Sequence, residues 1–388
     1  MLTRLPMQAD SRAPAVLQVL PRLETGGVER GTIEVAEALV RAGCRAVVAS
    51  AGGRLVPELL AVGATHLALP LASKDPWPMW RNARALAALI RAEGIAIVHA
   101  RSRAPAWSAR FAAGATGARW LTTYHGTYSE GFPGKRLYNS VMASGERVIA
   151  ISRFIAAHLI DRHGTDASRV RIIPRGVDPR RFDPALVNGA RVQRLAESWR
   201  IPEGAPVVLL PGRLTRWKGQ TVLLEAMARL SRADAVAVLA GDDQGRAGYR
   251  AGLERLVASL GLGGRVRIAG DCADMPAALA LADVVVNAST EPEAFGRVVV
   301  EAQAMARPVI ATAHGGAAET VTHGETGWLT PPGDAAALAA AIDAVLALPG
   351  ESRAAVGAAA RASVLARYTT ARMCAATLEV YRELLATR

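Results

Sequence analysis

Cysteine, aromatic residues and long apolar runs are all scarce in this sequence of 388 residues. The three cysteines, Cys44, Cys272 and Cys374, are too widely spaced for a metal site or a disulfide framework, so we expect buried, reduced thiols. Every apolar run is short and broken by Arg, Glu or Gly, whereas a membrane-spanning helix needs about 20 apolar residues. Residues 1–14 are polar and lack the apolar segment of a signal peptide. These absences predict a cytoplasmic protein.

Two phosphate-binding motifs are missing as well. No G-x-G-x-x-G sequence follows a predicted strand, which disfavours a dinucleotide cofactor and therefore a dehydrogenase. The basic turn at residues 211–219 does not match G-x-x-x-x-G-K-[ST], so it is not a P-loop.

Positive charge is concentrated in the first half of the chain. Residues 1–190 contain 25 Lys and Arg against 14 Asp and Glu, a net +11, whereas the remainder contains 21 against 20. A one-sided charge favours an anionic partner such as a membrane surface, a nucleic acid or an acidic substrate. A genome rich in Arg codons is the alternative explanation, but such a bias would affect both halves.

Two series of short apolar runs alternate with helical patterns, which predicts βαβ units and parallel sheets. The first series comprises residues 15–20, 46–49, 66–69, 95–99, 120–124, 148–151 and 170–173. The second comprises residues 206–211, 235–240, 265–269, 284–287 and 309–311. We therefore predict an α/β protein with two Rossmann-like, doubly wound domains facing across a cleft.

The domain boundaries follow from a linker rich in Pro and Gly at residues 178–205. We expect an N-terminal domain over residues 1–185 and a C-terminal domain over residues 186–368. A last helix over about 369–388 is expected to pack back on the first domain. Ligands of open α/β sheets bind beyond the carboxyl ends of the strands, so the turns after strands are the places to look for chemistry.

Two such turns in the first half carry candidate residues. Gly26 and Gly27, in T-G-G-V-E-R, precede a helix whose backbone N–H groups could meet a ligand. His125, in T-T-Y-H-G-T, ends a predicted strand and could exchange a hydrogen bond near neutral pH. A tight turn without a ligand and a structural histidine remain the alternatives.

The second half carries a basic turn and an acidic one. In P-G-R-L-T-R-W-K-G, Arg213 can bind a phosphate through two parallel hydrogen bonds, and Lys218 can bind one as a point charge. Together these two side chains suit a diphosphate. In E-P-E-A-F-G-R-V-V-V-E, Glu293 and Glu301 suggest binding of sugar hydroxyls. Solvated basic residues on a turn, and a solvated glutamate on a helix, are the alternatives.

These motifs, in this order and spacing, resemble the retaining glycosyltransferases of the GT-B fold, of the family-four type. The most diagnostic part is E-A-F-G…E-A followed by P-V-I-A-T-A-H-G-G. The resemblance implies catalytic roles for His125, Arg213, Lys218 and Glu293. It implies donor contacts from Gly26, Gly27, Gly212, Ala294, Phe295, Gly296 and Glu301.

In that family the histidine stabilises charge on the transferred sugar, and the Arg and Lys hold the diphosphate. The first glutamate lies against the sugar, and the second binds the ribose hydroxyls. No Asp-x-Asp motif ends a strand, and the adjacent Asp242 and Asp243 would be a poor substitute. The resemblance therefore implies a reaction that needs neither a metal nor a cofactor.

The acceptor is inferred from the basic first half, which predicts a lipid-linked or phosphorylated glycan such as a lipopolysaccharide core or a glycolipid. Lys135, Arg136 and Arg175 are candidate acceptor residues. Arg175 replaces the usual Asn of the family's N-G-V-D sequence and could meet a phosphate or an acidic acceptor. The resemblance assigns the acceptor to the N-terminal domain and the nucleotide sugar to the C-terminal domain. The segment K-D-P-W-P-M-W-R mixes Trp77 and Trp80 with charge, which suits either a peripheral membrane contact or a core. A sugar-nucleotide epimerase and a nucleic-acid-binding protein remain alternative functions.

Overall fold

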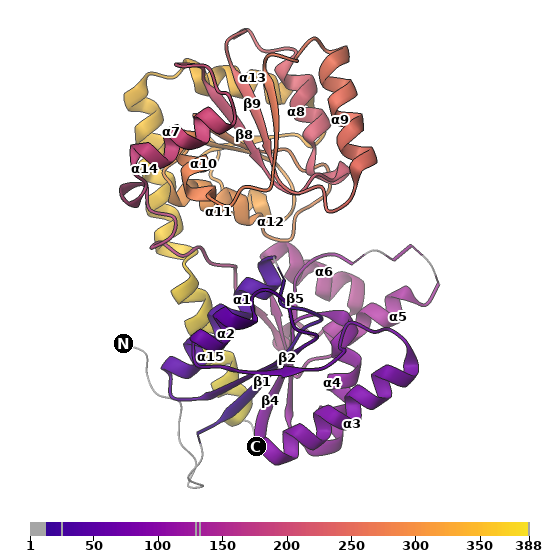
Figure 1. Cartoon of the computed structure of the whole chain (residues 1–388). Coiled ribbons are helices and arrows are strands. Elements are labelled where there is room, and N and C mark those ends of the chain that lie inside the picture. The colour runs from indigo at the N-terminus through magenta and orange to yellow at the C-terminus, as the bar shows by residue number, and fades with distance from the viewer. Residues whose placement is uncertain (1–12, 25, 129, 132, 387–388) are drawn as a thin grey trace. The chain divides into compact units, whose positions relative to one another are not determined.

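The computed structural model describes residues 13–24, 26–128, 130–131 and 133–386, and the chain forms two compact units (Figure 1). Unit 1 runs to Arg175 and resumes at Thr370, and unit 2 comprises Gly176–Thr369. Each unit contains a parallel β-sheet whose strands are connected mainly through helices. The predicted class, two Rossmann-like α/β domains, is therefore confirmed.

Within its described residues, unit 1 has a sheet of seven strands in the order β3-β2-β1-β4-β5-β6-β7, all parallel. The strands are β1 (Ala15–Val19), β2 (Arg45–Ser50), β3 (Thr65–Ala68), β4 (Ile95–Ala100), β5 (Arg119–Tyr124), β6 (Arg147–Ala150) and β7 (Val170–Ile172). The strand order reverses between β1 and β4, which makes their carboxyl ends the topological switch point.

The helices of unit 1 fill the connections between these strands. They are α1 (Gly27–Arg41), α2 (Val56–Ala61), α3 (Pro76–Glu93), α4 (Arg103–Thr116), α5 (Lys135–Ser140), α6 (Arg153–His163) and the 3-10 turns η1 (Val141–Ala143) and η2 (Ala167–Arg169). The last helix of the chain, α15 (Thr370–Ala386), lies beside α1 (Figure 1). Its buried Tyr381 hydroxyl lies 2.8 Å from Nδ1 of His99 on β4, so α15 completes the core of this unit.

The units divide at Arg175 and again at Thr370, whereas the sequence placed the first boundary ten residues later, at 185. The segment between belongs to unit 2 because its backbone is bonded there. The N–H of Val177 donates to the carbonyl oxygen of Tyr368 at 2.8 Å. Arg361 donates to the carbonyl oxygen of Phe182 at 3.2 Å and pairs with Asp183.

Unit 2 has, among its described residues, a parallel sheet of six strands in the order β10-β9-β8-β11-β12-β13. They are β8 (Val207–Pro211), β9 (Val236–Ala240), β10 (Val266–Gly270), β11 (Val284–Asn287), β12 (Val309–Thr312) and β13 (Trp328–Thr330). The switch point lies between β8 and β11. The sequence did not predict β13, because three residues between glycine-rich turns show no apolar run.

The connections of unit 2 contain mainly helices. They are α7 (Gly189–Ser198), α8 (Gln220–Met227), α9 (Ala247–Ser259), α10 (Met275–Leu281), α11 (Arg297–Ala304), α12 (Gly315–Ala318), α13 (Ala335–Ala347), α14 (Gly350–Arg367) and the 3-10 turns η3 (Pro184–Leu186) and η4 (Arg216–Lys218). Across the described residues no single helix has both the length and the apolar composition of a membrane span. Only α13 and α14 together pass that test, and they are bent by 112°.

All three cysteines are free thiols. Cys44 and Cys374 are buried as predicted, and Cys272 is half-buried. Burial raises the pKa of Cys44 to about 11, against a smaller opposite effect of Arg382.

Candidate active site

The turn after β8 crosses the carboxyl end of the unit 2 sheet. The N–H of Gly212 donates to the carbonyl oxygen of Ala240, the last residue of β9, at 2.9 Å. Gly219, which ends the turn, has a φ of +71°, and a Cβ there would lie 1.9 Å from the carbonyl oxygen of Ala288. Only glycine fits this approach, so the turn is fixed between the ends of β9 and β11, beside the switch point.

Arg213 and Lys218 occupy different environments in this turn. Arg213 is exposed, and its Nη1 lies 3.4 Å from Oε1 of Gln244, which is a long hydrogen bond. The side chain of Lys218 is only 13% exposed, and its Nζ lies 2.7 Å from Oε1 of Glu293. The same ammonium lies 4.4 Å from the centre of the Trp217 ring. Lys218 is therefore already paired, whereas Arg213 presents its charge to solvent.

Three donors converge on one carboxylate oxygen of Glu293. Besides Lys218, Nδ2 of Asn287 donates to Oε1 at 2.8 Å and Oγ of Ser289 at 2.5 Å. Burial opposes ionisation, but the charge of Lys218 and these hydrogen bonds hold the pKa of the carboxyl below its ordinary value. Among the described residues none donates to Oε2 of Glu293, so this oxygen can accept a hydrogen bond from a ligand hydroxyl.

The backbone around Glu293 is packed against the glycine pair of the H-G-G sequence. The N–H of Gly316 donates to the carbonyl oxygen of Glu293 at 2.7 Å. A Cβ on Gly315, which has a φ of +65°, would lie 2.6 Å from that oxygen, and a Cβ on Gly316 would lie 2.2 Å from the carbonyl oxygen of Ala294. The two glycines therefore allow the H-G-G backbone to pack directly against the backbone of Glu293 and Ala294.

The segment 294–296 leads from Glu293 into α11. Phe295 is buried, and its ring meets Tyr368 edge-on at 5.7 Å between centroids. Gly296 has a φ of +79° and caps α11 at its amino end. Glu301 lies on α11 with its side chain 15% exposed, and its Oε1 is 3.4 Å from Nη2 of Arg297. The predicted donor residues of this segment thus share one strand-to-helix connection.

In unit 1, His125 directly follows β5 and is held by Arg175. Nη2 of Arg175 lies 3.1 Å from Nδ1 of His125 and 3.0 Å from the carbonyl oxygen of Gly27. Because a guanidinium only donates, Nδ1 is the acceptor, and the neutral ring carries its proton on Nε2. Nε2 is buried and has no hydrogen-bond partner among the described residues. Burial, and after it the charges of Arg175 and Arg101, lower the pKa of His125 well below its ordinary value.

The predicted glycine pair begins α1. Gly26 is the residue before the helix and Gly27 its first residue, while Thr25 of the same motif lies outside the described residues. The bond from Arg175 ties Gly27 to His125, so the structure brings together three of the predicted residues of unit 1.

Lys135 and Arg136 start α5, after the His125 turn. Arg136 is exposed and donates to the carbonyl oxygen of Arg162 on α6. Lys135 is half-buried. No hydrogen bond or ion pair that the structure gives for the described residues joins Arg136 to His125 or Arg175.

Sequence reasoning missed Asn287 and Ser289, which hold Glu293. The polar letters N-A-S-T after the apolar run of β11 were the available signal, because polar residues at a carboxyl strand end face the ligand edge. The described residues contain no group of three or more His, Cys, Asp or Glu that could hold a metal ion. The Asp242 and Asp243 carboxylates instead accept the N–H groups of Gln244 and Gly245.

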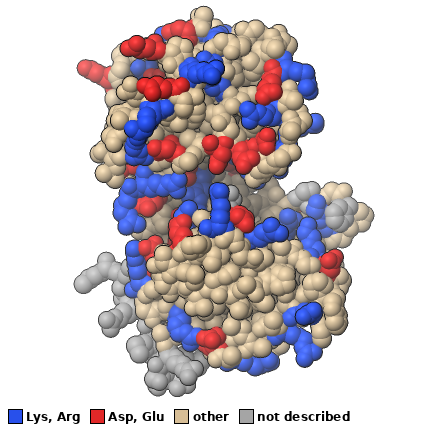
Figure 2. All heavy atoms as spheres, viewed as in Figure 1, with Lys and Arg blue, Asp and Glu red and all other residues tan. Residues whose placement is uncertain are grey.

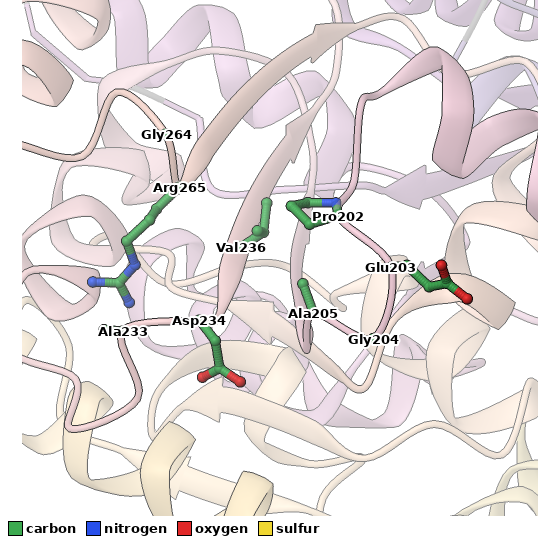
Figure 3. A pocket seen from close by; sticks show the side chains of 9 residues that line it. All are labelled: Pro202, Glu203, Gly204, Ala205, Ala233, Asp234, Val236, Gly264 and Arg265. Carbon is green, nitrogen blue, oxygen red and sulfur yellow. The ribbon is translucent and has the colours of Figure 1, made fainter.

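A pocket of about 350 Å³ lies at the opposite edge of the unit 2 sheet (Figure 3). Its lining residues lie at or just before the amino ends of β8, β9 and β10, as Ala205, Asp234 and Arg265 illustrate. Nε of Arg265 donates to the carbonyl oxygen of Ala235 at 3.1 Å, so this side chain already has a partner. A pocket at the amino ends of the strands is not where an open α/β sheet binds its ligand.

Two doubly wound units, each with polar loops at the carboxyl edge of its sheet, define the GT-B class. The "Glycosyltransferase Family 4" model matches residues 25–181, and the "Glycosyl transferases group 1" model matches residues 192–363. A crystal structure of a glycosyltransferase from Rickettsia africae is 38% identical and has a TM-score of 0.90, with 97% of this chain and 100% of that chain covered. The chain therefore belongs to the GT-B glycosyltransferases of the family-four type.

Two further relatives are more distant or match over a shorter stretch. The Anabaena protein Alr3699/HepE, crystallised with UDP-glucose, is 26% identical with a TM-score of 0.83, with 95% of this chain and 99% of that chain covered. A D-inositol 3-phosphate glycosyltransferase of Salinispora tropica is 36% identical over 223 residues, 53% of this chain and 45% of that protein. The chain thus spans about half the length of this curated relative.

Proposed function

We propose that the protein transfers a sugar from a nucleoside-diphosphate sugar to a hydroxyl of a lipid-linked or phosphorylated glycan, with retention of anomeric configuration and without a metal or cofactor. The observation that carries the proposal is the Lys218–Glu293 pair, fixed by Asn287 and Ser289 at the carboxyl edge of the unit 2 sheet. In this pair the Lys218 ammonium can bind a phosphate, and next to it Oε2 of Glu293 can accept a hydrogen bond from a sugar hydroxyl. The UDP-glucose complex of the Anabaena relative supports a uridine nucleotide as the first donor to test.

In this reaction the leaving diphosphate acquires negative charge, which Arg213 and Lys218 stabilise electrostatically. Glu293 accepts a hydrogen bond from the sugar through Oε2, and Glu301 accepts from the ribose hydroxyls. The Nε2–H of His125 donates to the transferred sugar. The acceptor hydroxyl attacks from the face that the diphosphate leaves, and the departing phosphate takes the proton, so no separate general base is required.

Unit 1 is the proposed acceptor and membrane side. On the face shown in Figure 2, it presents a broad uncharged area with Lys and Arg, interspersed with Asp and Glu, along its margins. Trp77 is 65% exposed and stacks on Trp80 at 5.0 Å, so these rings are on the surface and not in the core. An apolar groove of about 510 Å³ between α3 and α4 adjoins them, lined by Met79, Trp80 and Phe111 among others. Exposed aromatic rings among basic residues suit an anionic membrane surface.

The donor site is tested by thermal unfolding with UDP, GDP and ADP, each with and without EDTA. We expect one nucleotide to raise the melting temperature of the wild type in both conditions. Glu301→Ala should abolish that shift, whereas Glu325→Ala, an exposed glutamate elsewhere in unit 2, should keep it. A wild type that no nucleotide stabilises would refute the donor site, and a shift lost with EDTA would refute metal independence.

The membrane surface is tested by sedimentation with vesicles of phosphatidylglycerol or of phosphatidylcholine. We expect binding to the anionic vesicles alone, weakened about tenfold or more by Trp77→Ser with Trp80→Ser. Equal binding of this variant and the wild type would remove these rings from the proposal.

The epimerase alternative is tested by analysing the product formed without an added acceptor, because an epimerase converts the donor sugar under that condition.

A further inference from the structure

Two buried arginines converge at the switch point of the unit 1 sheet. Arg101 directly follows β4 and is 3% exposed, and Arg175 follows β7 and is 6% exposed. Both guanidinium groups lie against α1 at Gly31. A Cβ added there would be 2.2 Å from Nη1 of Arg175 and 3.1 Å from Nη2 of Arg101. Glycine at position 31 is therefore what allows the two cations to occupy one place.

Arg101 lacks the partners that a buried guanidinium normally has. Within the described part of the chain, its side chain forms no ion pair and no hydrogen bond, and its Nε is a buried donor without an acceptor. Leaving a buried charge unpaired lowers the stability of the fold. Of its neighbours, the Tyr381 hydroxyl and the Cys374 thiol are neutral, because burial raises the pKa of both groups. The Glu34 carboxylate favours the charged guanidinium of Arg101 but forms no ion pair with it among the described residues, and burial outweighs it and lowers the pKa of Arg101.

The acceptors that the described residues offer here all accept from Arg175, which leaves Arg101 without one. They are the carbonyl oxygen of Gly27, Nδ1 of His125 and Sδ of Met373. The amino end of α1, a helix of 15 residues, adds the positive end of a helix dipole next to Gly27. Fixed positive charge with unmatched donors is the chemistry that an oxyanion satisfies.

We propose that Arg101 and Arg175 bind the phosphate group of a phosphorylated acceptor, at the carboxyl end of β4 beside Gly31. The inference rests on the proposed function, because it assigns the acceptor class of that reaction. The cations assigned to the donor diphosphate, Arg213 and Lys218, belong to unit 2, whereas this pair belongs to unit 1, whose half of the sequence carries the excess positive charge. Because the phosphate of the acceptor and the diphosphate of the donor are chemically alike, the experiment must distinguish binding of the one from binding of the other.

The experiment measures binding of inorganic phosphate by ³¹P line broadening to full-length protein already saturated with UDP, and binding of UDP by calorimetry. We expect Arg101→Gln to weaken phosphate binding at least tenfold and to change the Kd of UDP less than twofold. Arg213→Gln should weaken UDP binding instead. Arg110→Gln, an exposed arginine of α4, is the matched control and should change neither.

Gly31→Ala provides a second variant that retains both arginines. Its methyl group must displace the guanidinium groups, so phosphate binding should fall as in Arg101→Gln. Arg101→Lys, which keeps the charge, covers the case in which Arg101→Gln does not fold, and should retain part of the binding.

Each outcome has a distinct meaning. Unchanged phosphate binding in Arg101→Gln and Gly31→Ala would overturn the site. An equal loss of UDP binding in Arg101→Gln would assign the pair to the donor diphosphate and overturn the acceptor assignment. Failure of the proposed function shows separately, as a wild type that binds no nucleotide; phosphate binding is then measured without UDP.

Discussion

Arg175 donates a hydrogen bond from Nη2 to Nδ1 of His125, with the two atoms 3.1 Å apart. The resemblance to the family gave no role for Arg175, since an Asn usually stands there, and the sequence made it only a candidate acceptor residue. The bond gives it one, because it orients the ring and leaves the proton of the neutral imidazole on Nε2. Arg175 is thus a positioning residue for His125 as well as a buried cation.

Replacing Arg175 with Ala is expected to lower kcat about tenfold or more, because the His125 ring loses its fixed tautomer and orientation. The KM for the donor should change much less, since the donor contacts assigned to unit 2 are untouched. The measurement is steady-state kinetics with the nucleotide sugar that stabilises the wild type. In a His125→Ala background and at saturating acceptor, Arg175→Ala should have little further effect on kcat, because a lost contact with the acceptor phosphate changes the KM of the acceptor instead. Additive losses in the double variant would show that Arg175 acts independently of His125.

The unfolding free energy should fall as the pH is lowered from about 7 to about 5. Burial lowers the pKa of both His99 and His125 well below the ordinary value, so the folded state keeps them neutral while the unfolded chain protonates them near pH 6.5. The unfolded state then binds more protons, and the slope approaches about 1.4 kcal/mol per pH unit for each histidine. Urea unfolding at a series of pH values measures this slope.

His125→Asn should make that pH dependence shallower, whatever it does to the stability at pH 8. His66, His158 and His163 also have lowered pKa values through burial and act in the same direction, so a residual slope is expected. An identical slope in the variant and the wild type would contradict the assignment of a neutral His125.

Breaking the Lys218–Glu293 pair from one side should destabilise unit 2 by about 3–5 kcal/mol, because the remaining charge stays buried without its partner. Lys218→Met and Glu293→Leu are the single variants, and urea unfolding is the measurement. The double variant should lose less than the sum of the two single losses. Removing one partner of the exposed Arg250–Glu254 pair should change the unfolding free energy little by comparison.

Gly219→Ala should destabilise unit 2 and abolish nucleotide binding, because the added Cβ would lie 1.9 Å from the Ala288 carbonyl oxygen. Gly324→Ala is the matched control, since Gly324 has a similar positive φ of +81° but nothing within 4 Å of the added atom. The control measures backbone strain alone, about 1–3 kcal/mol. Thermal unfolding and calorimetry with UDP compare the two. Equal losses in both variants would mean that the close approach to Ala288 has no consequence.

Much of the fold followed from the sequence because buried parallel strands appear as short apolar runs. All the predicted runs are strands, with ends within one residue or so of the observed ones. β13 was missed since three residues between glycine-rich turns leave no periodicity to detect. The mixture of Trp77 and Trp80 with charged residues was compatible with both a core and a surface position. Only the packing of α3 against α4 shows that these rings lie on the surface.

The arrangement of the candidate site residues could be predicted from the sequence only in part. Arg213, Lys218 and Glu293 could be named because each follows a strand, and carboxyl strand ends meet at one edge of a parallel sheet. That Asn287, Ser289 and Lys218 all donate to the same oxygen of Glu293 was not readable, because hydrogen-bond geometry depends on side-chain directions that no spacing encodes.

The sequence by itself determined the two parallel α/β sheets and which turns carry polar and glycine residues. Both can be predicted because the spacing of apolar residues and the residue types found in turns are local properties of the chain. Only the tertiary structure decided the environment of Arg175, whose partners Gly27 and His125 lie 148 and 50 residues away. It also decided that Arg101 shares the space above Gly31 with it. The order of the strands across the sheet creates these neighbours, and that order is a property of the whole fold, absent from any local pattern.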